Sequence, residues 1–178
     1  MNKNTIVVNL FGGPGTGKST GAAYVFSQLK LHGIDCELVT EFAKDKVWEK
    51  NEKVFNCQMY VTGKQTYKIM RVYGEVDVII TDSPILLGAA YTDSEKLKSA
   101  IVEEFNNYRN INIFLNRVKE YNPNGRHQNE DEAKAIDGQM LDLLNTYCST
   151  FGTPNYYVVD GNESGYNKIV QIIENFVE

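Results

Sequence analysis

The chain has 178 residues, a length typical of one domain with a single hydrophobic core. Its hydrophobic content of 42% and charged content of 23% are ordinary for a globular protein, and no apolar run approaches membrane-spanning length. The net charge of −5 argues against a broad nucleic-acid-binding surface but leaves room for a local basic patch. We expect a cytoplasmic protein without a membrane partner, because the N-terminus shows no signal-peptide pattern and the cysteines no disulfide or metal spacing.

The first predicted strand covers residues 5–10, and a helix is predicted over 21–30. Between them, residues 12–19 follow the pattern G-x-x-x-x-G-K-S, and this strand–loop–helix context is typical of a phosphate-binding P-loop. Glycines let successive backbone N–H groups face phosphate oxygens, and the helix adds the positive end of its dipole. The predicted ATP-binding residues are Gly13, Pro14, Gly15, Thr16, Gly17, Lys18, Ser19 and Thr20.

Two residues of this loop have distinct predicted roles. Lys18 is expected to reach the β- and γ-phosphates, and the Ser19 hydroxyl is expected to bind Mg²⁺. The alternative, a glycine-rich turn that only connects a strand to a helix, is disfavoured because position, spacing and flanks all agree with a P-loop. ATP and Mg²⁺ are therefore the predicted cofactors.

Strands and helices alternate along the rest of the chain. Further strands are predicted over 36–39, 76–81, 111–115 and 156–159, and helices over 44–56, 57–72, 94–107, 129–148 and 164–177. This alternation predicts an α/β fold of three layers, a five-stranded parallel sheet covered by helices on both faces. We expect residues 1–178 to form a single P-loop domain. Ligands of such folds bind at the carboxyl ends of the strands, where the remaining candidate residues lie.

Acidic residues follow two of these strands. Asp82 comes directly after 76–81, where P-loop proteins hold Mg²⁺ directly or through water, and it is also placed to take the proton of an acceptor hydroxyl. Glu41 follows the second strand and is expected to position the acceptor. Each residue also has a structural alternative. Asp82 begins an Asp-Ser-Pro sequence that is typical of a turn, and Glu41 could simply favour the start of a helix.

A polar segment over residues 116–129 follows the fourth strand and carries Arg117 and Arg126. We predict a lid that brings cations over the transferring phosphates and excludes water. Arg117 lies nearest the strand and has stacking on the adenine face as an alternative role, and a solvated loop is the plainer alternative for the segment. The turn at 160–162 is interpreted either as a neighbour of the nucleotide base or as a simple turn.

The region 41–73 is the predicted acceptor-binding region. Between residues 44 and 71, seven basic residues outnumber three acidic ones, which gives a local charge of +4. A phosphate on the acceptor, or DNA, suits this charge, and a solvated helix face is the alternative. Trp48, Tyr60 and Tyr67 are candidates for stacking on a base or for packing in the core. The sequence leaves open whether the chain forms an oligomer.

Together, the P-loop, Glu41 to Lys44, Asp82 to Pro84 and the segment from Arg117 to Arg126 resemble small P-loop kinases of the nicotinamide-riboside kinase-like and thymidylate kinase-like families. They are also similar to small P-loop proteins of tailed bacteriophages, which would act in the host cytoplasm. Some phage kinases of the thymidylate kinase-like group phosphorylate 5-hydroxymethyluracil in DNA.

The resemblance implies an ATP- and Mg²⁺-dependent kinase that transfers the γ-phosphoryl group to a hydroxyl of a nucleoside- or nucleotide-like acceptor. The implied catalytic residues are Lys18, Asp82, Arg117 and Arg126, with Glu41 and Asp82 at the substrate and Ser19 and Asp82 at the metal. Asp82 is followed by Ser83-Pro84, whereas thymidylate kinases usually have Asp-Arg there, so the acceptor stays open. A hydroxymethylated base in DNA is one alternative, and a P-loop NTPase or nucleotide switch without a small-molecule acceptor is another.

Overall fold

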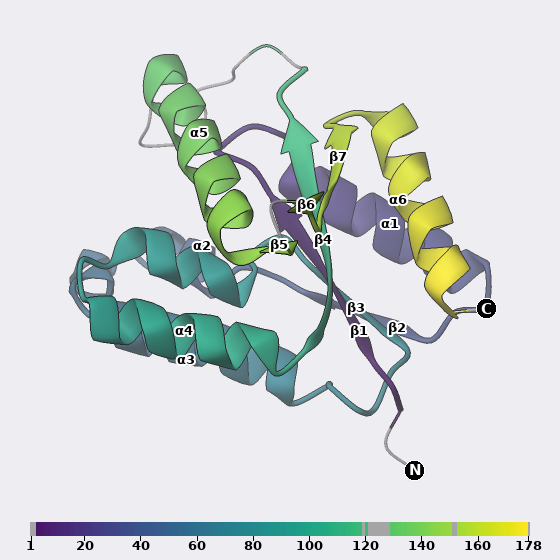
Figure 1. Ribbon diagram of the computed structural model, residues 1–178, viewed down its shortest axis with the longest axis horizontal. Helices are drawn as coiled ribbons and strands as arrows, with labels where there is room; N and C mark the ends of the chain where they lie inside the picture. The colour runs from purple at the N-terminus through teal and green to yellow at the C-terminus, as the bar shows by residue number, and fades with distance from the viewer. Residues whose placement is uncertain (1–2, 119, 121–128, 151–152, 178) are drawn as a thin grey trace.

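The computed structural model describes residues 3–118, 120, 129–150 and 153–177. Its main sheet has five strands in the order β2-β3-β1-β4-β7, and each neighbouring pair is parallel (Figure 1). The strands are β1 (Ile6–Phe11), β2 (Cys36–Val39), β3 (Val78–Thr81), β4 (Arg109–Asn116) and β7 (Tyr157–Asp160). The predicted parallel sheet is therefore confirmed, with β1 in its centre.

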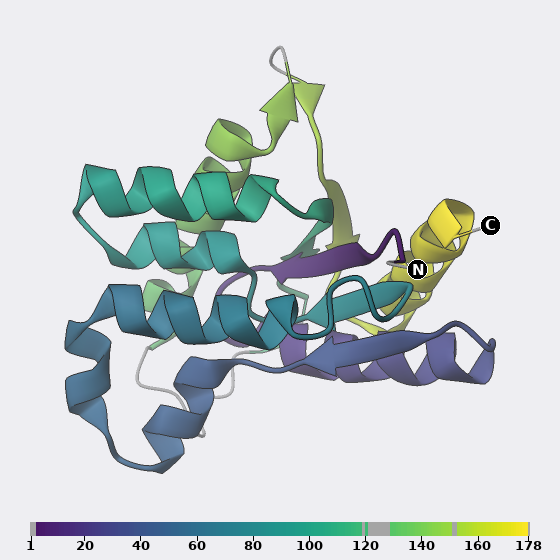
Figure 2. The same ribbon diagram turned by 90° about the horizontal axis from the view of Figure 1, so that it is seen from below.

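Helices cover both faces of this sheet (Figures 1 and 2). All six residues of β1 are buried, and all of them except Asn9 belong alternately to two apolar clusters. Val8 and Leu10 pack with α1 (Lys18–Leu31) and α6 (Glu163–Val177) on one face. Val7 and Phe11 pack on the other face with α3 (Gln58–Met70), α4 (Glu95–Asn106) and α5 (Glu130–Tyr147). This two-faced burial explains why β1 is apolar at every position except Asn9, since both sides of a covered parallel strand lie in the core.

The predicted helix over 44–56 is wrong. The structure has α2 (Phe42–Trp48), a break at Lys50, and a 3₁₀ helix η1 (Glu52–Asn56). Lys50 has a φ of 54°, in the left-handed region where a right-handed helix ends. Neither α2 nor η1 has a buried residue, so no core packing holds the two pieces in one helix.

Three further elements were not predicted. The 3₁₀ helix η2 (Ile85–Tyr91) follows Pro84 and buries Ile85 and Leu86, and β5 (Ser149–Thr150) pairs antiparallel with β6 (Thr153–Pro154). The other predicted helices are confirmed to within a few residues of their bounds. Asn129 and Glu132 form a capping box at the start of α5. Within the part of the chain that the structure describes, none of the helices is both long and apolar enough to cross a membrane.

Candidate functional site

The P-loop runs from the end of β1 into α1, which begins at Lys18. Gly12, Gly15 and Gly17 have φ angles of 137°, 87° and 97°, which residues with a Cβ atom rarely adopt. Gly13 is required for a different reason, since a Cβ atom there would lie 2.5 Å from Asp137 Oδ1 and 2.6 Å from the Ala133 carbonyl oxygen. The glycines of the motif therefore serve both the backbone turn and the close approach of α5.

The Lys18 side chain folds across this loop. Its ammonium donates hydrogen bonds to the carbonyl oxygens of Gly12 at 2.5 Å and Gly13 at 3.0 Å. Burial lowers the pKa of Lys18, and the nearby carboxylates of Glu41 and Asp82 partly oppose this shift. The cation and two of the predicted acidic residues therefore share one electrostatic environment.

Ser19 and Asp82 are in direct contact. Ser19 Oγ, in the first turn of α1, donates to Asp82 Oδ2 at 2.6 Å just after the end of β3. Asp82 is only 6% exposed, and its Oδ1 atom is buried without a hydrogen-bond partner among the described residues. An unpaired carboxylate oxygen beside a hydroxyl is a suitable pair of hard oxygen ligands for Mg²⁺. Within the described ranges no cluster of three or more His, Cys, Asp or Glu residues forms a metal site, so Mg²⁺ here would also need phosphate or water ligands.

Glu41 lies at the start of α2, where its extended backbone precedes the first helical residue. The backbone of the next residue, Phe42, is held by α3, because its N–H donates to Gln65 Oε1 at 2.9 Å. Burial raises the pKa of Glu41, the Lys18 charge lowers it, and the Asp82 charge raises it further. A raised pKa makes a carboxylate a stronger base than an ordinary glutamate.

Arg117 directly follows β4, and its side chain is 10% exposed. Its Nε donates to Asp137 Oδ2 at 2.9 Å and its Nη2 to Asp137 Oδ1 at 3.1 Å. The guanidinium is therefore paired with α5 beside the P-loop, because Asp137 Oδ1 also accepts the Gly13 N–H at 2.6 Å. Arg126 and most of the predicted lid over 116–129 lie outside the described residues.

Sequence reasoning missed two side chains that support the P-loop. Asp137 contacts its first half, as described above, and Tyr166 of α6 contacts its second half. The Tyr166 hydroxyl lies 3.1 Å from the carbonyl oxygens of both Gly17 and Gly161. The turn after β7 also packs on the loop, because a Cβ atom at Gly161 would overlap the Thr16 carbonyl oxygen. Neither side chain has a signal in the sequence, since each is far from the motif along the chain.

The predicted acceptor-binding region exposes its aromatic residues. Trp48 is 74%, Tyr67 58% and Tyr60 43% exposed, so these rings are not core. Tyr60 makes an edge contact with Phe42, and Lys64 Nζ lies 5.5 Å from the Tyr60 ring centre. In the described part of the chain, Lys46 and Lys68 have acidic partners, whereas the other five cations of 44–71 form no ion pair (Lys44, Lys50, Lys53, Lys64 and Arg71).

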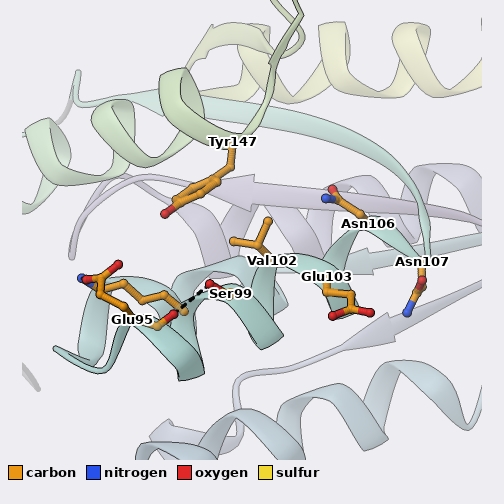
Figure 3. Close-up of a pocket in the computed structure, with 8 residues that line it drawn as sticks. Glu95, Ser99, Val102, Glu103, Asn106, Asn107 and Tyr147 are labelled. Atoms are coloured by element: carbon orange, nitrogen blue, oxygen red, sulfur yellow. Dashed lines mark hydrogen bonds and ion pairs between the residues drawn. The ribbon is translucent and has the colours of Figure 1, made fainter.

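A hollow of about 490 Å³ lies elsewhere, along α4 (Figure 3). It is lined by polar residues of α4 and the turn after it, and by Tyr147 at the end of α5. Lys98, which also lines it, is paired with Glu95 at 2.8 Å. The hollow contains no residue predicted for the site, so the candidate site remains the cluster around the P-loop.

Comparisons with known proteins agree with this description of the fold. The chain is similar to a solved deoxyadenosine kinase from M. mycoides with bound dATP, at 16% identity and a TM-score of 0.56, over 96% of this chain and 98% of the other. A second structure of that kinase, with the products dCMP and dCDP, gives 16% identity and a TM-score of 0.57 with the same coverage. The crystal structure of APE1195 is 21% identical with a TM-score of 0.51, over 100% of this chain and 99% of the other.

No curated protein matches the sequence. Residues 7–159, most of the chain, match a family described as an AAA domain. The match begins in β1 and ends in β7, so it contains the P-loop and all of the parallel sheet except Ile6 and Asp160. The chain therefore belongs to this AAA-domain family, and its fold is like that of the deoxyadenosine kinase from M. mycoides.

Proposed function

We propose that the protein is an ATP- and Mg²⁺-dependent kinase of a nucleoside- or nucleotide-like acceptor. The observation that carries this proposal is the meeting of Ser19, Asp82 and Lys18 at the P-loop with Glu41 in the same electrostatic environment. A P-loop alone binds phosphate, whereas a kinase also needs a group for the acceptor hydroxyl. The similarity in fold to deoxyadenosine kinase supports the same conclusion.

The residues divide into a donor side and an acceptor side. Lys18 neutralises charge on the β- and γ-phosphates, and Ser19 and Asp82 hold Mg²⁺, which when bound neutralises and orients the phosphates. Because Asp82 Oδ2 is engaged by Ser19, we assign the acceptor proton to Glu41, whose raised pKa suits a base. The acceptor hydroxyl oxygen bonds to the γ-phosphorus, the bond from that phosphorus to the β–γ bridging oxygen breaks, and ADP leaves.

One surface favours DNA as a second candidate acceptor. Tyr60, Lys64, Tyr67 and Arg71 are exposed and recur every three or four residues at one side of α3. Exposed aromatic rings alternating with cations suit stacked bases and their phosphates. Tyr60 contacts Phe42, which follows Glu41, so this surface is connected to the proposed base.

The test is a phosphoryl-transfer assay with γ-labelled ATP and Mg²⁺. The acceptor panel contains nucleosides including deoxyadenosine, mononucleotides, nicotinamide riboside, and single-stranded DNA with and without 5-hydroxymethyluracil. We expect label on a nucleoside- or nucleotide-type acceptor, and about a hundredfold to a thousandfold less transfer with the Lys18→Ala variant. Label on DNA alone would favour the second candidate, and free phosphate released at a rate that no acceptor changes would replace the kinase with an NTPase.

A further inference from the structure

One carboxylate, that of Asp137, connects three segments around the P-loop. It lies in the third turn of α5, and its Oδ1 atom accepts the Gly13 N–H at 2.6 Å. Its two oxygens also receive Nε and Nη2 of Arg117 at 2.9 and 3.1 Å. The first half of the P-loop, the end of β4 and α5 are thus joined at a single side chain.

The connection is tight and largely removed from water. The side chains of Arg117 and Asp137 are 10% and 17% exposed, and no room remains for a Cβ atom at Gly13. A forked pair of charge-assisted hydrogen bonds fixes orientation as well as distance. Removing one member of such a pair leaves the other charge uncompensated at a poorly hydrated site.

We propose that Asp137 is a positioning residue for the donor nucleotide, which holds the Gly13 amide and the Arg117 guanidinium in a fixed relation before the nucleotide binds. The inference rests on the proposed function, because it requires a nucleotide at the P-loop. Asp137 acts through Gly13 and Arg117 and does not itself touch the phosphates. This preorganisation favours nucleotide binding, because the loop and the arginine lose less conformational freedom when the nucleotide binds.

The charges around Lys18 support this role. Carboxylates face Lys18 from three elements (Glu41 at α2, Asp82 after β3, Asp137 on α5), and Arg117 is the cation that faces it from the end of β4. The Arg117 charge lowers the pKa of Lys18, and the Asp137 charge raises it. Without Asp137, one of the three carboxylates that oppose the lowering of the Lys18 pKa would be lost, and the Arg117 guanidinium would lose the partner that aligns it.

The experiment is a double-mutant cycle on the full chain with Asp137→Asn, Arg117→Gln and the double variant. The dissociation constants of Mg·ATP and Mg·GTP are measured by equilibrium titration, and folding is checked by circular dichroism and thermal unfolding. Asp142→Asn is the matched control, since it makes the same change at an exposed position of α5. Because the double variant leaves no unpaired buried charge, it keeps the test valid if Asp137→Asn alone does not fold.

We expect Asp137→Asn to weaken Mg·ATP binding by about tenfold to a hundredfold, the range for losing charge-assisted hydrogen bonds. The double variant should bind about as weakly as the weaker single variant, because each change already disables the other partner. Asp142→Asn should bind as wild type does. The positioning role alone would be overturned if the folded Asp137→Asn variant or the double variant bound Mg·ATP as tightly as wild type does. It would also be overturned if the effects of the two single changes on binding were additive. A wild-type protein that binds neither nucleotide would refute the proposed function itself.

Discussion

Replacing Gly161 by alanine is a direct test of how closely the turn after β7 packs on the P-loop. The added Cβ atom would overlap the Thr16 carbonyl oxygen and lie 3.0 Å from the Asn116 carbonyl oxygen. Both obstacles are backbone atoms, so no side chain can rotate to make room. Either the P-loop or the turn has to move, and Gly161 is itself held by a 2.9 Å hydrogen bond from its N–H to the Asn116 carbonyl oxygen.

The expected size of the effect follows from overpacking, which typically destabilises a fold by about 1–3 kcal/mol. For a chain of this length each kcal/mol lowers the unfolding temperature by roughly 2–4 °C, so a cost of about 2 kcal/mol gives a drop of about 4–8 °C. Because the clash falls inside the phosphate-binding loop, Mg·ATP should also bind more weakly and raise the unfolding temperature less than it does for wild type.

The assay is thermal unfolding followed by circular dichroism, with and without Mg·ATP. Gly138→Ala is the matched control, because an added Cβ atom on this exposed position of α5 meets nothing within 4 Å. It should stabilise the fold by about 0.5–1 kcal/mol through helix propensity. If Gly161→Ala unfolds at the wild-type temperature and binds Mg·ATP equally well, the reasoning about this contact is wrong.

Three further predictions concern the site. Lys18→Ala should lower phosphoryl transfer by about a hundredfold to a thousandfold in the labelled-ATP assay, since it removes a cation from the phosphates; a smaller loss would contradict its assignment. Because burial raises the pKa of Glu41 above its ordinary 4.5, the transfer rate should fall on acidification with an inflection above that value. Glu41→Gln should abolish this limb of the pH–rate profile along with most activity. It should also stabilise the fold at neutral pH, and this gain should disappear as the pH falls below 4.5, where the wild-type carboxyl becomes protonated in both the folded and the unfolded state. Tyr166→Phe should cost about 1 kcal/mol in denaturant unfolding, because its hydroxyl donates to a P-loop carbonyl; an unchanged midpoint would exclude that contribution.

The fold was predictable because its central strands are apolar on both faces and alternate with helical segments along the chain. The break between α2 and η1, inside residues 44–56, was not predictable. It depends on Lys50, and a lysine with a positive φ has no signature in the sequence. The 3₁₀ helix after Pro84 was missed for a related reason. Its residues are small and apolar without a helical period, and burial against the core decides their conformation.

The site divides in the same way. Lys18 and Ser19 belong to a local motif, and Asp82 and Glu41 follow strands whose carboxyl ends had to meet, so these positions were predictable. Asp137 and Tyr166 were not, because they contact the loop across 124 and 149 residues of sequence. Each belongs to a helix in which an acidic or aromatic residue is unremarkable. Only the packing of α5 and α6 on the sheet brings them to the P-loop.

The absence of buried residues from α2 and η1 has a consequence for the dynamics and the evolution of the protein. Segments that bury little apolar surface open at a small fraction of the global unfolding free energy, and their amides exchange with solvent first. The helices beside the donor side, α1 and α6, contribute to the core and should exchange slowly. Substitutions in α2 and η1 should therefore change the unfolding free energy of the whole fold only slightly. Under the proposed function, changes in residues 42–56 would alter the acceptor preference while leaving the core packing of α1 and α6 unchanged.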